Sequence, residues 1–127
     1  MEHSLKTRYQ AATPYVTRDG SVIRELLHPA QHAAALGAER QSLAEATVTA
    51  GQSTSLHRHH RSEELYHITA GHGLMTLAAE SFAVCAGDTV CIPPGTPHRI
   101  ENTGDVELKI LCCCAPAYAH EDTELLE

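Results

Sequence analysis

The sequence predicts an all-β domain in which short strands form a sandwich or a barrel around one core. Short segments that alternate apolar and polar residues recur along the chain, and Gly, Pro and Asp-Gly turn signals separate them. Many short strands joined by such turns are typical of this architecture. The 127 residues suffice for one domain with a buried core. With no repeat, linker or low-complexity segment, we expect residues 1–127 to form a single domain.

The N-terminal part of the chain predicts a strand pair followed by a loop and a third strand. Residues 14–27 hold two β-type runs with the Asp19-Gly20 turn signal between them. Residues 29–40 read as a loop, with a helical turn at 31–36. Residues 41–50 alternate small apolar and polar side chains, so they predict a strand with one buried face.

The C-terminal part predicts further strands and a short acidic tail. Residues 74–86 read as a hairpin that turns near Glu80. Residues 106–115 alternate apolar residues on one face and begin with polar residues on the other, as expected of a strand. The tail, residues 116–127, is acidic and is expected to be partly helical.

Three histidines and one glutamate lie at metal-ligand spacing in two stretches, residues 51–71 and 87–102. His57 and His59 are two residues apart, so on a strand both point to the same face. Glu64 has the wrong parity for the same straight strand, so a turn through residues 60–62 has to intervene. His98 follows a Pro- and Gly-rich turn and opens another short strand. Imidazole and carboxylate together suit one divalent transition metal: Fe, Mn, Zn, Ni or Co.

The two stretches resemble the paired motifs of the cupin superfamily, small antiparallel β-barrels of the double-stranded β-helix or jelly-roll type that usually carry a metal. The first cupin motif is matched by Gly51, His57, His59, Glu64 and Gly71. The second motif is matched by Gly87, Pro93, Gly95, His98 and Asn102. Fifteen residues separate the motifs, as in compact single-domain members. The resemblance therefore implies a cupin barrel with a metal bound by His57, His59, Glu64 and His98.

The glutamate position has one alternative. Glu63 would satisfy a shorter spacing after His59, but it would then lie seven residues from Gly71 instead of six. We prefer Glu64, which places Tyr66 and not Leu65 on the inward face.

Charge and composition exclude several partners. The net charge is −7 with neutral histidines, and no basic patch is evident, so nucleic acid and anionic membranes are poor partners. No apolar run approaches the roughly 20 residues of a membrane helix, and the N-terminus lacks the apolar region of a signal peptide. We expect a cytoplasmic protein whose partner is a small-molecule substrate or ligand.

The five cysteines do not predict a disulfide framework, because their number is odd. Cys112, Cys113 and Cys114 are adjacent, and neighbouring residues of a strand point to opposite faces, so the three thiols cannot form one compact metal site. We expect them to serve as small buried apolar residues.

Three hypotheses for function remain open. The resemblance implies a metal-dependent enzyme acting on a small polar substrate, such as a sugar isomerase, epimerase or lyase. The alternatives are an iron-dependent dioxygenase and a domain that binds a metal or small ligand without turnover. A phosphosugar site would need inward-facing cations, but Arg58 and Arg99 have the opposite parity from the ligands. Tyr66 shares the face of Glu64 and is a candidate acid/base or substrate contact.

We also expect a homodimer. A small antiparallel barrel leaves sheet edges that need cover. Residues 1–27 are our candidate for crossing to a partner, as in cupins of this kind.

Overall fold

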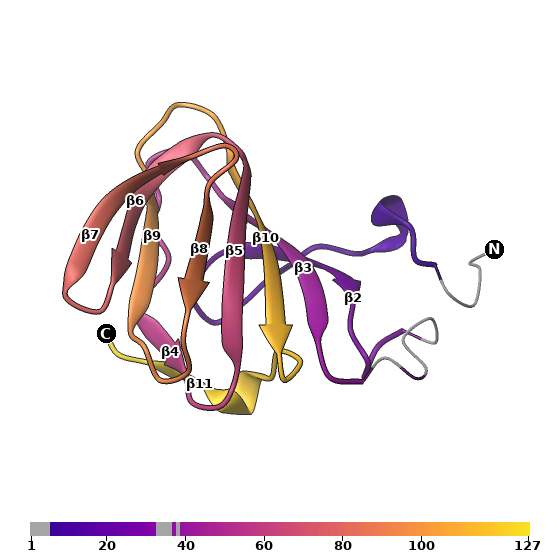
Figure 1. Ribbon diagram of the computed structural model, residues 1–127. Helices are drawn as coiled ribbons and strands as arrows, with labels where there is room; N and C mark the ends of the chain where they lie inside the picture. Colours follow the sequence, from indigo (N-terminus) through magenta and orange to yellow (C-terminus); the bar gives the residue numbers. More distant parts are fainter. Residues whose placement is uncertain (1–5, 33–36, 38) are drawn as a thin grey trace.

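The computed structural model describes residues 6–32, 37 and 39–127, and its regular structure is almost entirely β. The strands form two antiparallel sheets that face each other (Figure 1). The larger sheet has the order β1 (Tyr15–Val16), β2 (Val22–Leu27), β3 (Ser42–Val48), β10 (Leu108–Ala115), β5 (Glu63–Ala70) and β8 (Thr89–Ile92). The smaller sheet has the order β11 (Thr123–Leu125), β4 (His57–His59), β9 (His98–Asn102), β6 (His72–Leu77) and β7 (Glu80–Cys85). The short 3₁₀ helices η1 (Tyr9–Ala11) and η3 (His120–Asp122) flank them.

The strands from β3 to β10 pair as one long hairpin folded back on itself. The innermost pair is β6 with β7, followed by β5 with β8, β4 with β9 and β3 with β10. Successive pairs alternate between the two sheets, which is the double-stranded β-helix, or jelly-roll, arrangement. The predicted fold class is therefore confirmed. Within the described residues the hydrogen-bonded ladders form two sheets and not one closed ring.

Aliphatic side chains from both sheets fill the space between them. Ile68 and Ile110 come from the larger sheet, whereas Met75 and Ile100 come from the smaller one, and all four are essentially fully buried. Each lies at an inward position of a strand whose neighbours in sequence point outward, so the period-2 pattern is what builds this core. Three residues of this core, Tyr66, Ile100 and Ile110, also line the site described below.

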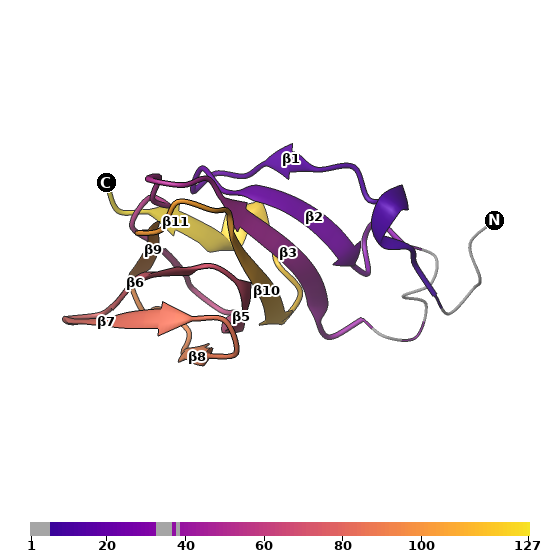
Figure 2. The same ribbon diagram turned by 90° about the horizontal axis from the view of Figure 1, so that it is seen from above.

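The predicted strand pair at residues 14–27 is confirmed as β1 and β2. Gly20 has φ +94° in the turn between them, a conformation that glycine adopts without the steric cost of a Cβ atom. In Figure 2 this hairpin extends the larger sheet at one edge, next to β3. The hairpin pairs here with β3 of its own chain, and its exchange between subunits stays a prediction.

Several predicted boundaries shift, and two strands were missed. The hairpin of residues 74–86 turns at residues 78–79, so Glu80 begins β7 and does not form the turn. The predicted tail contains η3, but it then continues as strand β11, which the acidic composition concealed. Strand β8, only four residues long, was also not predicted. The helical turn expected at 31–36 falls largely outside the described residues.

Membrane insertion through a helix finds no support in the described part of the chain, since none of its helices has the length and apolar character needed to span a bilayer.

Candidate metal centre

Three buried histidines from the smaller sheet converge at one point between the sheets. His57 and His59 lie on β4, and His98 lies opposite His57 on β9. One nitrogen atom from each of the three rings lies within 4.8 Å of the other two. The His57 and His98 ring centroids are 4.2 Å apart. Because all three side chains are buried, this cluster could hold a metal ion.

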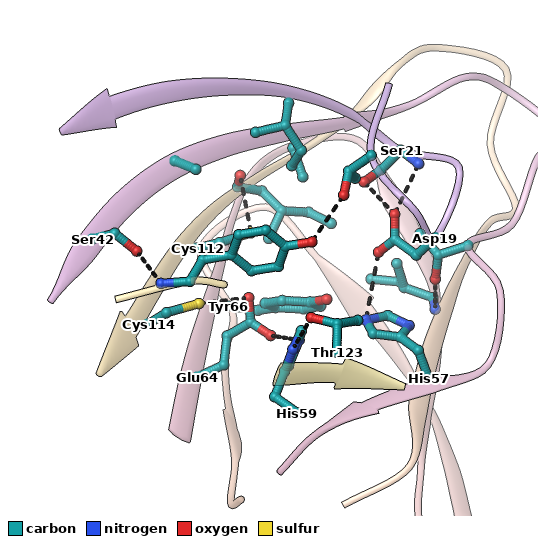
Figure 3. A pocket seen from close by; sticks show the side chains of 18 of the residues that line it. Asp19, Ser21, Ser42, His57, His59, Glu64, Tyr66, Cys112, Cys114 and Thr123 are labelled. Carbon is teal, nitrogen blue, oxygen red and sulfur yellow. Dashed lines mark hydrogen bonds and ion pairs between the residues drawn. The ribbon is translucent and has the colours of Figure 1, made fainter. Parts of the chain in front are cut away.

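Glu64 reaches the cluster from the opposite sheet (Figure 3). Its Oε1 atom lies 3.2 Å from His59 Nε2 and 3.6 Å from His98 Nε2. Glu64 is 5% exposed, whereas the neighbouring Glu63 is exposed on the outer face of β5. The register with Glu64 inward is therefore the one that the structure adopts, and the four side chains chosen from the motifs lie together.

The change of parity between His59 and Glu64 depends on a turn that the C-terminal tail holds in place. Where a turn was predicted at residues 60–62, the chain bends at residues 60–61. The buried carboxylate of Asp122 accepts hydrogen bonds from the backbone N–H groups of Arg61 and Ser62. The backbone N–H of His60 donates to the Asp122 carbonyl. A residue far away in the sequence thus brings strands β4 and β5 into the relative position that the site needs.

Hydrogen bonds at Nδ1 set the tautomer of each histidine. His57 Nδ1 lies 2.7 Å from the Ser55 carbonyl, and His98 Nδ1 lies 2.9 Å from the Thr96 carbonyl. A carbonyl only accepts, so both Nδ1 atoms carry a proton.

His59 follows the same rule through a side chain. The Thr123 hydroxyl donates to the Ala119 carbonyl, so its oxygen accepts from His59 Nδ1 at 2.9 Å. Each ring, when neutral, therefore directs an Nε2 lone pair into the cluster, the usual arrangement of metal-binding histidines.

Two polar atoms at the centre of the cluster are buried and have no hydrogen-bond partner among the described residues. They are Glu64 Oε1 and His98 Nε2. The other carboxylate oxygen, Glu64 Oε2, accepts from the Cys114 thiol at 3.3 Å. Buried polar atoms are seldom left unpaired in folded proteins. The donor set of three imidazole nitrogens and one carboxylate oxygen therefore fits a divalent first-row metal.

The electrostatics keep Glu64 ionised. Burial alone would raise the pKa of Glu64, but the close contacts of its carboxylate with His59 and His98 lower it to about 2. Burial lowers the pKa of His59, but Glu64 outweighs that effect and raises it. Burial and the neighbouring His98 lower the pKa of His57. A buried carboxylate that stays negative at neutral pH attracts a cation to the cluster.

A cavity of about 600 Å³, including the part open to solvent, adjoins the cluster. Its polar wall comes largely from the N-terminal hairpin and the C-terminal tail, which supply Asp19, Glu25 and Tyr118. Asp19 Oδ2 lies 3.5 Å from His57 Nε2. No lysine or arginine belongs to the cavity lining in the described part of the chain. The expectation that Arg58 points away is correct, because it pairs with Glu124 at the surface.

The model of the cupin domain family matches residues 44–114, more than half of the chain. This protein is a cupin. It is 58% identical over 123 residues to the uncharacterized protein MJ1618 of Methanocaldococcus jannaschii, a match that spans 97% of this chain and 95% of the archaeal one. Among solved structures, a predicted oxalate decarboxylase from Thermotoga maritima has 25% identity and a TM-score of 0.74, covering 86% of this chain and 96% of that chain. The nucleoside dehydratase Pac13 of Streptomyces, at 18% identity, has a TM-score of 0.73, with 96% and 90% covered, and shows likeness of fold.

Tyr66 lies in this cupin's cavity on the same strand face as Glu64, as predicted. Its ring meets the His98 ring edge-on, with centroids 5.9 Å apart. Burial, followed by the nearby charge of Glu64, raises the pKa of Tyr66 well above its ordinary value. The phenol therefore stays protonated at neutral pH and can donate a hydrogen bond into the cavity.

Two of the three cysteines of β10 are buried as predicted, whereas Cys113 is not. Cys112 and Cys114 are buried and free on the inward face, and Cys113 is partly exposed on the outer one. Cys112 packs in the core as expected. Cys114 does more than pack, because burial raises the pKa of its thiol and the protonated thiol donates to Glu64.

Sequence reasoning missed the residues that the chain ends bring to the site. Asp19, Tyr118, Asp122 and Thr123 lie outside both motifs, so no spacing pointed to them. The sequence did give a sign of Glu25, because apolar residues lie two positions before and after it in β2, a spacing that puts residues on one face of a regular strand. A charged residue on an otherwise apolar face is unusual and indicates a specific role.

Proposed function

We propose that this cupin is a metal-dependent enzyme that acts on a small polar substrate at an open centre held by His57, His59, Glu64 and His98. The observation that supports it best is the set of three Nε2 lone pairs, fixed by hydrogen bonds at Nδ1, around a buried carboxylate oxygen without a partner. The expected occupant is one divalent transition metal, Fe, Mn, Zn, Ni or Co.

The centre is proposed to be open because the chain offers only four protein ligands. Octahedral first-row metals take six ligands, so positions toward the cavity are left for water or substrate. A metal bound there would supply Lewis acidity to an oxygen atom of the substrate. The cavity lies directly beside the cluster, so a substrate oxygen can reach it.

The reaction class that we favour is isomerisation, epimerisation or elimination. All three require groups that move a proton near a polarised oxygen. In this chain, Asp19 supplies a carboxylate next to His57, and Tyr66 supplies a protonated hydroxyl in the same cavity. We assign to Asp19 the removal of a proton from substrate carbon and to Tyr66 a hydrogen bond to substrate oxygen. The similar Thermotoga protein is a predicted oxalate decarboxylase, and decarboxylases also belong to the lyases.

Metal analysis of purified, untagged protein tests the first half of the proposal. We expect about one metal ion per chain in the wild type and none in the variants His57→Ala and His98→Ala. The matched control is His67→Ala, which removes an exposed imidazole on the outer face of β5 and should keep the metal. Metal-free wild type after aerobic and anaerobic purification alike would overturn the metal centre.

Two measurements test whether the centre is open and active. Manganese-loaded protein should enhance the relaxation of water protons, because a water molecule exchanges on an open position. Turnover of aldoses, ketoses and hydroxy acids, followed by NMR in deuterated water, should depend on the metal and incorporate deuterium at carbon. A shell with no exchangeable water would defeat the enzyme proposal and leave a structural or binding role.

A further inference from the structure

We propose that Glu25, positioned by Tyr15, determines substrate specificity by binding a hydrogen-bond donor, so that this cupin selects neutral or cationic polar molecules over anions. The inference rests on the proposed function above and names the substrate class of the same cavity. Glu25 lies on β2 of the N-terminal hairpin, outside the matched cupin domain of residues 44–114.

The carboxylate of Glu25 has one satisfied and one free oxygen. Its Oε1 atom accepts a hydrogen bond of 2.9 Å from the Tyr15 hydroxyl. Its Oε2 atom is buried and, among the described residues, has no hydrogen-bond partner. Glu25 is only 5% exposed, yet it lines the cavity. A buried carboxylate oxygen left unpaired in a cavity calls for a donor from outside the chain.

Small side chains connect Glu25 with the metal centre. Register places Glu25 beside Ala44, Ala44 beside Cys112, and Cys112 beside Tyr66. This row crosses the larger sheet over three strand spacings, roughly 14 Å along the curved sheet. Because Ala44 and Cys112 are small, they leave room above them for a ligand. A ligand that lies along this row would reach from Glu25 to Tyr66, whose ring contacts His98 of the metal centre.

The charges around the cavity favour the same class of ligand. Asp19, Glu25 and Glu64 line it, and no lysine or arginine side chain joins them in the described residues. The nearest hairpin cations are engaged elsewhere. Arg18 donates to the carbonyls of His120 and Thr123, and Arg24 donates to the Ala12 carbonyl. An anionic group far from the metal would meet no cationic side chain of the described lining, whereas an amine or hydroxyl finds Glu25 Oε2.

Three linear six-carbon polyols that differ at one end provide the test: glucamine with an ammonium group, sorbitol with a hydroxyl, and gluconate with a carboxylate. Their dissociation constants would be measured on metal-loaded protein by calorimetry. We expect glucamine to bind most tightly and gluconate most weakly, with at least a tenfold difference between them. Glu25→Gln should reduce that difference to less than threefold, and Glu25→Lys should reverse the order.

Controls separate this inference from the proposed function. Glu45→Gln changes a carboxylate on the outer face of the adjacent strand β3 and should preserve the preference. The metal content and melting temperature of each variant show whether it is folded and loaded. If the wild type binds no metal, the proposed function fails. Three other outcomes, each with metal bound, would refute only the role of Glu25. Gluconate or oxalate could bind as tightly as glucamine, no polyol could bind at millimolar concentration, or Glu25→Gln could leave the preference intact.

Discussion

The hydrogen bond between Thr123 and His59 offers the sharpest test of how the fold prepares the metal centre. Replacing Thr123 by Val keeps the shape of the side chain but removes the oxygen that accepts from His59 Nδ1. The tautomer with the proton on Nε2 then becomes competitive, and that tautomer has no lone pair to offer a metal.

The magnitude follows from burial. His59 is 5% exposed, so water does not readily replace the lost acceptor, and an unpaired buried donor costs about 1–3 kcal/mol of folding free energy. Losing the partner of a ligating histidine typically weakens metal binding about 10–100-fold, which corresponds to roughly 1.4–2.7 kcal/mol. We therefore expect a lower melting temperature and a weaker metal site in Thr123→Val.

Competition with a fluorescent chelator measures the affinity, and ¹⁵N NMR of the imidazoles reports the tautomer directly. The matched control is Thr69→Val, which also removes a hydroxyl that donates to a backbone carbonyl, but at an exposed position away from the site. An unchanged metal affinity in Thr123→Val, together with an Nδ1–H tautomer of His59, would refute the reasoning that this hydrogen bond prepares the ligand.

Three further predictions address acid stability, Tyr66 and assembly. Burial alone would raise the pKa of Asp122, but backbone hydrogen bonds hold it below its ordinary value of 3.8 in the folded protein. The ionised carboxylate therefore stabilises the fold fully above about pH 4, and this stabilisation is lost as the pH falls through the pKa of Asp122 in the folded state. Asp122→Asn should therefore flatten the acid limb of the melting-temperature profile, and an unchanged limb would contradict this. Tyr66→Phe should leave the metal content unchanged, and should lower kcat at least tenfold if its hydroxyl contacts the substrate. Leu43 and Leu65 lie exposed on the outer face of the larger sheet, on either side of Cys113. We expect light scattering to give twice the chain mass of 13.7 kDa, and Leu65→Glu to give the monomer; a monomeric wild type at micromolar concentration rules the dimer out.

Local patterns in the sequence predicted the fold class and the side chains at the centre of the site. Alternation placed Tyr66 and Ile68 on one face of β5, a consequence of the two-residue period of a strand, which depends only on neighbouring residues. The spacing to Gly71 distinguished Glu64 from Glu63 through the resemblance to the cupin motif. Short elements without strong alternation, such as β8 and β11, did not reveal themselves, because a strand of three or four residues is decided by its partners and not by its own side chains.

The sequence by itself determined that this chain is an all-β cupin and which four motif side chains share a site. Only the tertiary structure decided what surrounds them. Asp122 and Thr123 act on residues some sixty positions earlier, and Glu25 faces the cavity because β2 adds to the edge of β3. Such contacts form when distant segments pack against each other to bury apolar surface and pair polar groups, and no local period encodes them. The orientation of His59 and the acidic groups Asp19 and Glu25 of the cavity therefore come from the ends of the chain, where the sequence carries no motif.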